Sequence, residues 1–327
     1  ASRACFGRLR ADDARRLVDA AAARGLGGDV ALGAALADVT SLRVGGAADV
    51  LVRARSIDDL AGWWRLAHAL AIPVRVIGRG TNVLAGDGGC QGLVIVNRCE
   101  RWSVEPRGTG EAGPADAAEV RCESGVTLAA LAQSLARAGW AGIEAGVGIP
   151  GSVGAGVVTN AGAHGWEMAD SVVAVEVIAR DGSLQRLAPA ALGFRYRGSR
   201  LKGDTEHAVL GVTLRVVRDA PAAILDRIAA YTARRRATQP TAPSVGSMFK
   251  NPAGDHAGRL IEAAGLKGVA VGGAEVSPVH ANFFVNRGGA RAADVLALMR
   301  LAQERVRARF GIALEPEIER LGVDDVV

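Results

Sequence analysis

The chain has 327 residues, of which 49% are hydrophobic and 22% are charged, which is typical of a folded globular protein and excludes a disordered one. The length favours two or three domains, because single hydrophobic cores stop growing near ~250–300 residues. The net charge of +5 fits either a solvated Arg-rich surface or a cleft that attracts polyphosphate ligands. The densest basic cluster, Arg234–Arg236, is too short to indicate a nucleic-acid partner.

The cysteines, Cys5, Cys90, Cys99 and Cys122, have none of the spacings of a metal or redox site. We therefore expect free thiols, no metal and a reducing compartment. No stretch reaches the ~18 apolar residues of a membrane-spanning helix. Residues 1–10 lack the apolar region of a signal peptide, so the expected location is cytoplasmic.

Hydrophobic periodicity predicts mixed helices and strands up to residue 139. Helices are expected at residues 11–24, 56–70 and 127–139, and strands at 47–54, 73–78, 93–97 and 120–123. Ser56 is the expected N-cap of the second helix. Residues 107–117 are rich in Gly, Pro, Asp and Ala and predict a hairpin loop. Alternation of the two kinds of element favours α/β or α+β layers.

The composition changes sharply between residues 142 and 165, where nearly all residues are small and neither a helical nor a strand pattern is present. Regular patterns return after this run. They predict strands at 171–178, 208–217 and 281–286, and helices at 219–237, 257–264 and 290–310. Residues 238–243 (TQPTAP) are the best candidate for a linker between domains.

Two glycine-rich segments are candidates for ligand binding. Gly78–Val83 (GRGTNV) follows a predicted strand, and its backbone N–H groups can face a phosphate, although a plain tight turn explains it equally well. It is neither a Walker loop nor a GxGxxG motif. The run Gly146–Gly165 has few hydrogen-bonding side chains, so it fits a long flat ligand held by main chain. So many glycines are costly in folding entropy unless close approach is needed.

Three short motifs follow, and each alone has an ordinary explanation as a turn or a surface segment. They are Tyr196–Ser199 (YRGS), Gly246–Pro252 (GSMFKNP) and Leu314–Glu317 (LEPE). Together with the two glycine-rich segments and with Thr40–Gly46 (TSLRVGG), they resemble in order and spacing the motifs of the MurB family of flavin-dependent reductases. The resemblance covers about residues 38 to 322.

This chain departs from the family pattern at two points. It has Gly154-Ala155-Gly156 where the family often has a Gly-Gly pair. It has Glu319, followed by Arg320, where the family often has an arginine, so a flavin contact from that arginine is not carried over. The chain also lacks the Tyr-bearing substrate loop of one branch and so resembles the shorter second type.

The resemblance implies an α+β fold, in which a two-part FAD-binding domain of the PCMH or vanillyl-alcohol-oxidase kind is joined to a smaller α/β substrate domain. The FAD-binding domain would span residues 1–237, the substrate domain 238–314, and residues 315–327 would return to the first. The implied reaction is NADPH-dependent reduction of UDP-N-acetylglucosamine enolpyruvate to UDP-N-acetylmuramate through non-covalent FAD, a step of peptidoglycan precursor synthesis. A monomer with no nucleic-acid or membrane partner is expected.

The resemblance also implies residue roles. The catalytic group would be Arg197 and Glu317, which stabilise charge on the substrate carboxylate, and Ser247, which gives a proton to C2. The residues expected to bind FAD are Gly78, Arg79, Gly80, Thr81, Asn82, Val83, Val147, Ile149, Pro150, Gly151, Ser152, Gly154, Asn160, Ala161 and Gly162. The residues expected to bind the substrate are Tyr196, Arg235, Lys250, Asn251 and His280.

Two alternatives remain, one a different enzyme of the same fold and the other a protein of another functional class. Another FAD-dependent oxidoreductase of the same fold, acting on an alcohol or sugar, would share the glycine-rich loops but would not need Arg197, Ser247 and Glu317 as a set. Such enzymes often tether the flavin through His or Cys, and His164 is the nearby candidate. A non-catalytic sugar-nucleotide-binding protein would tolerate loss of Ser247, which this chain keeps.

Overall fold

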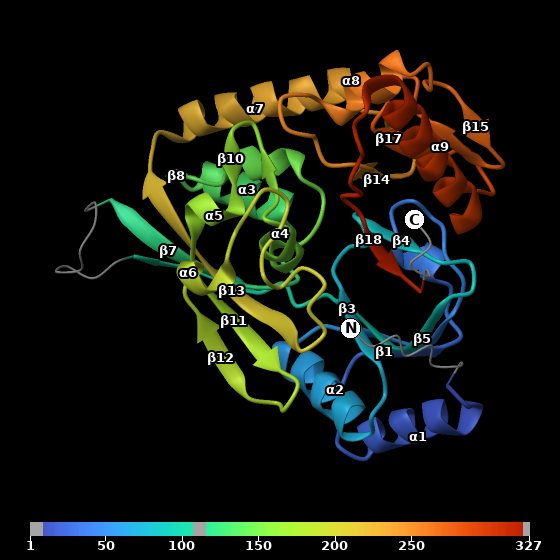
Figure 1. Cartoon of the computed structure of the whole chain (residues 1–327). Helices are drawn as coiled ribbons and strands as arrows, with labels where there is room; N and C mark the ends of the chain where they lie inside the picture. Colours follow the sequence, from blue (N-terminus) through green and yellow to red (C-terminus); the bar gives the residue numbers. More distant parts are fainter. Residues whose placement is uncertain (1–8, 107–115, 323–327) are drawn as a thin grey trace.

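The computed structural model describes residues 9–106 and 116–322, which form three sheet-based units (Figure 1). The predicted hairpin loop at 107–117 falls almost entirely outside the described residues. The expected α+β class is confirmed, because antiparallel strand pairs predominate and the helices lie on the faces of the sheets.

The N-terminal unit is a four-stranded sheet in the order β1 (Asp29–Leu32), β2 (Ala48–Ala54), β5 (Cys90–Asn97), β3 (Val74–Ile77). Helices α1 (Ala11–Ala22) and α2 (Ile57–Ala69) pack against it, and η1 (Leu36–Val39) is a short 3-10 turn. Ser56 caps α2 as predicted, since its Oγ accepts from the Asp59 N–H at 3.1 Å. Leu60, Trp63, Trp64 and Ala67 follow helical spacing and are all buried, which fixes α2 on the sheet.

The central unit is a six-stranded antiparallel sheet. Its order is β12 (Leu184–Leu187), β11 (Val172–Ala179), β13 (His207–Arg218), β7 (Ala117–Glu123) and β6 (Trp102–Pro106), with β8 (Trp140–Ala141) also paired to β13. Helices α3 (Leu128–Arg137), α4 (Val153–Thr159) and α5 (Met168–Ser171) contribute to its core. The shorter elements are η2 (Glu144–Gly148), the hairpin β9 (Gly162–Ala163) and β10 (Trp166–Glu167), and α6 (Pro189–Leu192).

The expectation that residues 142–165 contain no helix is wrong at α4. Ser152 accepts from Ala155 N–H at the start of this helix, and Asn160 ends it in the left-handed region with φ 44°. Glycine inside the helix serves packing, because a Cβ at Gly154 would lie 2.7 Å from the Cβ of Ser124. Tertiary contact and end caps therefore produce a helix that residue propensity does not predict.

The C-terminal unit follows α7 (Pro221–Thr238), which runs from the central sheet to this unit along one edge of the molecule (Figure 1). Its sheet order is β14 (Ser244–Ser247), β17 (Phe283–Asn286), β16 (Ala274–Val276), β15 (Ala270–Val271), covered by α8 (Ala257–Ala263) and α9 (Ala292–Phe310). Asp87 of the N-terminal unit accepts from Ala292 N–H at 2.7 Å and Ala293 N–H at 3.0 Å, which joins α9 to that unit.

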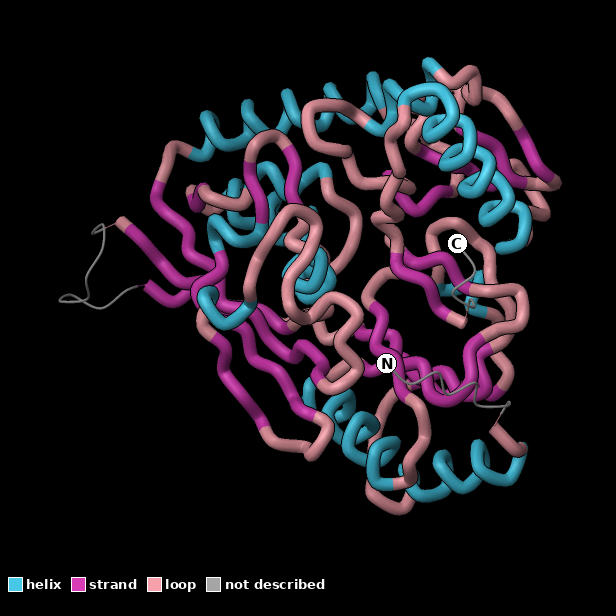
Figure 2. Tube along the Cα trace, in the orientation of Figure 1, coloured by secondary structure: helices cyan, strands magenta, loops and turns pink. Residues whose placement is uncertain are grey.

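After α9 the chain returns to the N-terminal unit. Strand β18 (Glu319–Leu321) pairs in parallel with β4 (Val83–Ala85), which directly follows the Gly78–Val83 segment. The two strands lie side by side between the N-terminal and C-terminal units (Figure 2). The return places the Leu314–Glu317 motif beside the first glycine-rich segment. Within the described residues, none of the helices combines the length and apolar character that a membrane span requires.

Candidate active site

The two glycine-rich segments meet, although about seventy residues separate them in the sequence. The Thr81 Oγ donates to the Pro150 carbonyl at 3.1 Å. Gly80 has φ +63°, and a Cβ there would lie 2.1 Å from the Val39 carbonyl oxygen, so this turn needs glycine on both conformational and steric grounds. The two segments thus form one wall.

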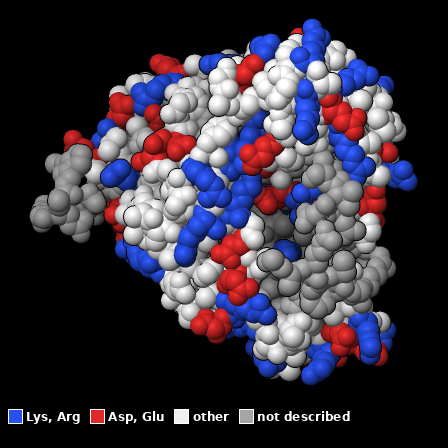
Figure 3. Space-filling view, viewed as in Figure 1, with Lys and Arg blue, Asp and Glu red and all other residues white. Residues whose placement is uncertain are grey.

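A cavity of about 370 Å³ lies against this wall. The predicted FAD-binding residues that line it are Gly78, Arg79, Gly80, Thr81, Asn82, Val83, Ser152 and Gly154. The others, which are outside its described lining, are Val147, Ile149, Pro150, Gly151, Asn160, Ala161 and Gly162. Their contact with FAD stays a prediction. Figure 3 shows a hollow near the middle of the face seen in Figure 1, with basic and acidic side chains on its rim.

Several polar residues of the cavity were not predicted. Asn97 ends β5 and donates from Nδ2 to the Ser124 Oγ at 2.7 Å, and that hydroxyl donates to the Val209 carbonyl at 2.6 Å. His207 Nδ1 lies 2.8 Å from Asp204 Oδ2 further along the lining. A sequence signal existed for Asn97, because a polar residue directly after a buried apolar strand often lies at a ligand-facing edge.

Arg197 and Glu317 form an ion pair. Arg197 Nε lies 2.9 Å from Glu317 Oε1, and the two side chains are 23% and 20% exposed. The Nε–H is not aligned with the oxygen, so the contact is electrostatic rather than a hydrogen bond by geometry. The structure therefore brings together two side chains that are about 120 residues apart and that the sequence assigned to one catalytic group.

Buried side chains fix the turn that carries Arg197, whose own φ is 55°. Asn160 is fully buried, donates from Nδ2 to the Arg195 carbonyl at 3.1 Å and accepts from Ala169 N–H at 3.0 Å. Ser199 is also fully buried, and its hydroxyl donates to the Val158 carbonyl at 2.9 Å. Both amide ends of Asn160 are thus engaged within the protein, where they hold the Arg197 turn.

The main chain around Glu317 joins the remaining motifs. The Glu317 N–H donates to the Met248 carbonyl at 2.9 Å, and Phe249 and Pro316 form an antiparallel bridge. The Glu317 carbonyl accepts from Asn82 Nδ2 at 3.4 Å. Ser247, the last residue of β14, is therefore adjacent in the chain to the residue that binds Glu317. The Gly78–Val83, Gly246–Pro252 and Leu314–Glu317 motifs meet at Glu317.

The electrostatic environment of Glu317 favours the protonated form more than water does. Burial raises the pKa of its carboxyl above the ordinary value, against the opposing effect of Arg197, Lys202 and Lys250. A carboxyl of this kind retains its proton to higher pH than an exposed glutamate and can then donate a hydrogen bond.

Two of the residues predicted to bind substrate lie beside this centre. The Tyr196 side chain is half exposed, and its ring centroid is 5.2 Å from the Arg197 Cζ. The Lys250 Nζ pairs with the Glu315 carboxylate, while its backbone N–H donates to the Glu315 carbonyl at 2.9 Å. The exposed Tyr196 ring can turn toward a ligand, whereas the Lys250 side chain is 20% exposed and would have to leave Glu315 to do so.

The other three have partners within the protein. Asn251 Oδ1 accepts from Ala257 N–H at 3.0 Å at the start of α8. His280 Nδ1 accepts from Asn282 N–H at 3.2 Å, and Arg235 donates to the Gly148 carbonyl. These contacts give each residue a structural role, and their roles in substrate binding stay predictions.

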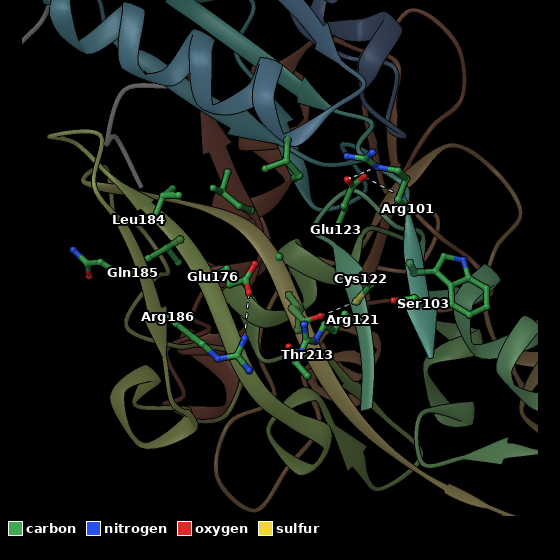
Figure 4. A pocket seen from close by; sticks show the side chains of 16 residues that line it. Arg101, Ser103, Arg121, Cys122, Glu123, Glu176, Leu184, Gln185, Arg186 and Thr213 are labelled. Atoms are coloured by element: carbon green, nitrogen blue, oxygen red, sulfur yellow. Dashed lines mark hydrogen bonds and ion pairs between the residues drawn. The ribbon is translucent and has the colours of Figure 1, made fainter. Parts of the chain in front are cut away.

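A second hollow, of about 590 Å³, lies on the outer face of the central sheet (Figure 4). Four of its charged side chains pair with one another, Arg101 with Glu123 at 2.8 Å and Arg186 with Glu176 at 3.2 Å, and Arg121 pairs with Glu105 at 3.0 Å. None of the residues that line it belongs to the motifs. Size alone is therefore a poor guide, and the smaller cavity at the motifs is the candidate active site.

Comparisons with known proteins agree with this geometry. A family described as the C-terminal domain of UDP-N-acetylenolpyruvoylglucosamine reductase matches residues 239–321, and an FAD binding domain family matches residues 48–188. The chain is 45% identical over 287 residues to UDP-N-acetylenolpyruvoylglucosamine reductase 2 of Symbiobacterium thermophilum, covering 86% of this chain and 89% of that one.

The corresponding reductase of Rubrobacter xylanophilus is 44% identical, and the match covers 86% of this chain and 92% of the other. Among solved structures, the reductase MurB from Thermus caldophilus superimposes with a TM-score of 0.72 at 38% identity, over 90% of this chain and 99% of that one. The chain therefore belongs to the UDP-N-acetylenolpyruvoylglucosamine reductase family.

Proposed function

We propose that this protein reduces UDP-N-acetylglucosamine enolpyruvate to UDP-N-acetylmuramate, a step of peptidoglycan precursor synthesis, using bound FAD with NADPH as the reductant. The observation that carries the proposal is the meeting of Arg197, Glu317 and the Ser247 strand beside the glycine-rich cavity. Membership of the reductase family supports the same reaction and argues against an enzyme that oxidises an alcohol or sugar.

The residues of the cavity fit FAD. At Gly78 the two glycine-rich segments pack so closely that a Cβ would lie 2.4 Å from the Ser152 Oγ. Gly78 therefore borders the cavity with its main chain alone. Arg79 borders the same space, and its buried Nε has no hydrogen-bond partner among the described residues. A guanidinium N–H with no partner beside a glycine-rich turn suits a ligand that carries phosphates. His164, the tethering candidate, stacks on Tyr231 with ring centroids 4.2 Å apart.

When bound, FAD would supply a carrier that takes a hydride equivalent from NADPH and passes it to C3 of the enolpyruvyl group. Arg197 would hold the substrate carboxylate, because its planar charge pairs with carboxylates at two points. Glu317, whose pKa is raised by burial, would donate a hydrogen bond to the same carboxylate when it carries a proton. The pair would thereby stabilise the negative charge that builds up on this side of the substrate.

Ser247 would complete the addition by giving its hydroxyl proton to C2. Serine is a weak general acid, so the transfer needs a strongly basic carbon and a nearby cation. Lys250 is three residues further along the same segment and acts electrostatically on Glu317, which places a cation near the reacting group. Bulk water would then restore the serine proton.

We further infer that the chain divides near residue 238 into an FAD-binding part and a substrate-binding part that ends near 314, with the last strand returning to the first part. The C-terminal unit has a core of its own, to which Leu42, Val44 and Leu84 of the first part also contribute, and the β18–β4 pairing supports the return of the last strand. The monomeric state and the cytoplasmic location remain predictions. The location follows from the substrates, because UDP sugars and NADPH are cytoplasmic metabolites.

The test measures NADPH oxidation by the purified protein with and without the enolpyruvyl substrate, together with mass analysis of the product. We expect substrate-dependent NADPH oxidation and a product heavier by two hydrogens. Denaturation should release the flavin. NADPH consumption with no reduced sugar nucleotide would contradict the proposed reaction.

A further inference from the structure

We propose that Lys202 is a positioning residue that holds the main chain of Glu317 in the active site. The inference rests on the proposed function and extends it. Met248 and Asn82 already bind the Glu317 main chain, and Lys202 adds a contact from the loop that carries Arg197. Lys202 lies outside the three motifs quoted for the catalytic group.

The contacts of Lys202 support this role. Its Nζ donates to the Glu317 carbonyl at 3.1 Å and lies 3.4 Å from Glu319 Oε1. The side chain is 18% exposed. An ammonium group removed from water to this extent requires partners in the protein. Here they are the Glu317 carbonyl, which accepts its hydrogen bond, and the Glu319 carboxylate at ion-pair distance. Lys202 thus binds the segment that carries the catalytic carboxyl.

Lys202 is on the same loop as Arg197, and buried Ser199 organises both. The Ser199 hydroxyl accepts from Leu201 N–H at 3.2 Å, and its carbonyl accepts from Lys202 N–H at 3.2 Å. From this loop Arg197 reaches the carboxylate of Glu317 while Lys202 reaches its carbonyl. The loop therefore grips Glu317 at two points, one on the side chain and one on the main chain.

The charges around Glu317 predict that loss of Lys202 changes the pKa of this carboxyl. The cations that act on it are Arg197, Lys202 and Lys250. The two neighbouring carboxylates are each paired, Glu315 with Lys250 and Glu319 with Lys202. Removing the lysine charge at 202 would take away one cation and leave Glu319 without that partner. Both changes raise the pKa of Glu317 further, so any pH-dependent step that depends on its proton shifts to higher pH.

The experiment compares Lys202→Met with Arg200→Met, a matched control in the same loop whose side chain is exposed. We expect Lys202→Met to lower kcat by up to ~10²-fold, the cost of a displaced catalytic group, while the control stays near the wild type. The basic limb of the kcat profile should move to higher pH only in Lys202→Met. Lys202→Arg, which keeps the charge, should recover part of the loss.

Two further measurements separate positioning from general stability. Flavin absorbance and thermal unfolding should stay close to those of the control. NMR titration of labelled glutamate, assigned with Glu317→Gln, should show the Glu317 pKa raised in Lys202→Met, whether or not the variant turns over. A kcat and a pKa equal to those of the control would overturn the inference, as would a loss of flavin and of thermal stability that matches the loss of kcat.

Measuring the wild-type protein alongside the variants distinguishes failure of this inference from failure of the proposed function. A wild-type protein that does not reduce the enolpyruvyl substrate would overturn the proposed function, and the positioning role with it. A wild-type protein that reduces it, with Lys202→Met equally active at every pH, would overturn only the role of Lys202.

Discussion

Arg197 has an unfavourable backbone conformation that neighbouring residues stabilise. Its φ of 55° lies in the left-handed region, which a side chain with a Cβ adopts at a cost. Asn160 and Ser199 offset that cost by filling buried hydrogen-bonding positions on either side of the turn. The motifs identified both Arg197 and Glu317 as members of one catalytic group, but the supporting role of Asn160 depends on contacts between distant segments.

Replacing Arg197 by lysine tests the need for a planar cation. Lysine keeps the charge but cannot pair with a carboxylate at two points. We expect kcat to fall by ~10²–10³-fold with little change in flavin content. Steady-state kinetics and the flavin-to-protein absorbance ratio measure the two quantities, with Arg200→Lys as control. Equal losses of kcat and flavin would show that Arg197 is structural.

Asn160 offers a second test at the residue scale. Asn160→Ala leaves the Arg195 carbonyl and the Ala169 N–H without their partner, which should lower the free energy of unfolding by ~2–4 kcal/mol. Asn160→Gly loses the same bonds but adopts φ 44° freely, so it should be less destabilised by ~1–2 kcal/mol. Urea unfolding compares the pair. A glycine variant no more stable than the alanine variant would contradict the conformational part of this explanation.

At the scale of elements, long periodic segments and the short strands β3 and β17 were predictable, while the shortest strands and helix α4 were not. Helices α1, α2, α3, α7, α8 and α9 and the strands β2, β5, β11 and β13 begin and end within a few residues of their predicted positions. Strands β4 and β18 have three residues each, too few for a periodic pattern, and they are stabilised by their mutual pairing and by the burial of Leu84, Ala85 and Leu321. Helix α4 depends on its caps and its contact with Ser124, neither of which periodicity records.

The conformation of the Gly78–Val83 turn predicts that it does not tolerate a side chain at Gly80. Gly80→Ala combines a positive φ with a clash against the Val39 carbonyl, so it should lower the free energy of unfolding by more than ~1 kcal/mol and reduce flavin content. Gly88→Ala is the matched control, because a Cβ there has open space. Thermal unfolding and flavin absorbance measure both variants. Equal behaviour of the two alanines would mean that the turn adapts without loss.

At the scale of the whole molecule, the three units are joined around the active site. The Ser41 hydroxyl donates to the Ser244 carbonyl at 2.6 Å, and Asn286 Nδ2 donates to the Leu42 carbonyl at 2.9 Å. The C-terminal strand closes the arrangement by pairing with β4. The sequence predicted which motifs form the site. Asn97 had a local signal at the end of a buried strand, but its contact with Ser124 could not be predicted, because it depends on how the central sheet faces the N-terminal one.

The central claim is that the protein reduces an enolpyruvyl substrate with Ser247 as its proton donor, and stopped-flow flavin absorbance of Ser247→Ala tests it most directly. The rate at which NADPH bleaches the flavin should match the wild type, because that step delivers no proton to substrate carbon. Recovery of the absorbance after the enolpyruvyl substrate is added should slow by ~10²–10⁴-fold, the usual cost of a lost general acid. Equal slowing of bleaching and recovery, or no slowing of recovery, would contradict the account.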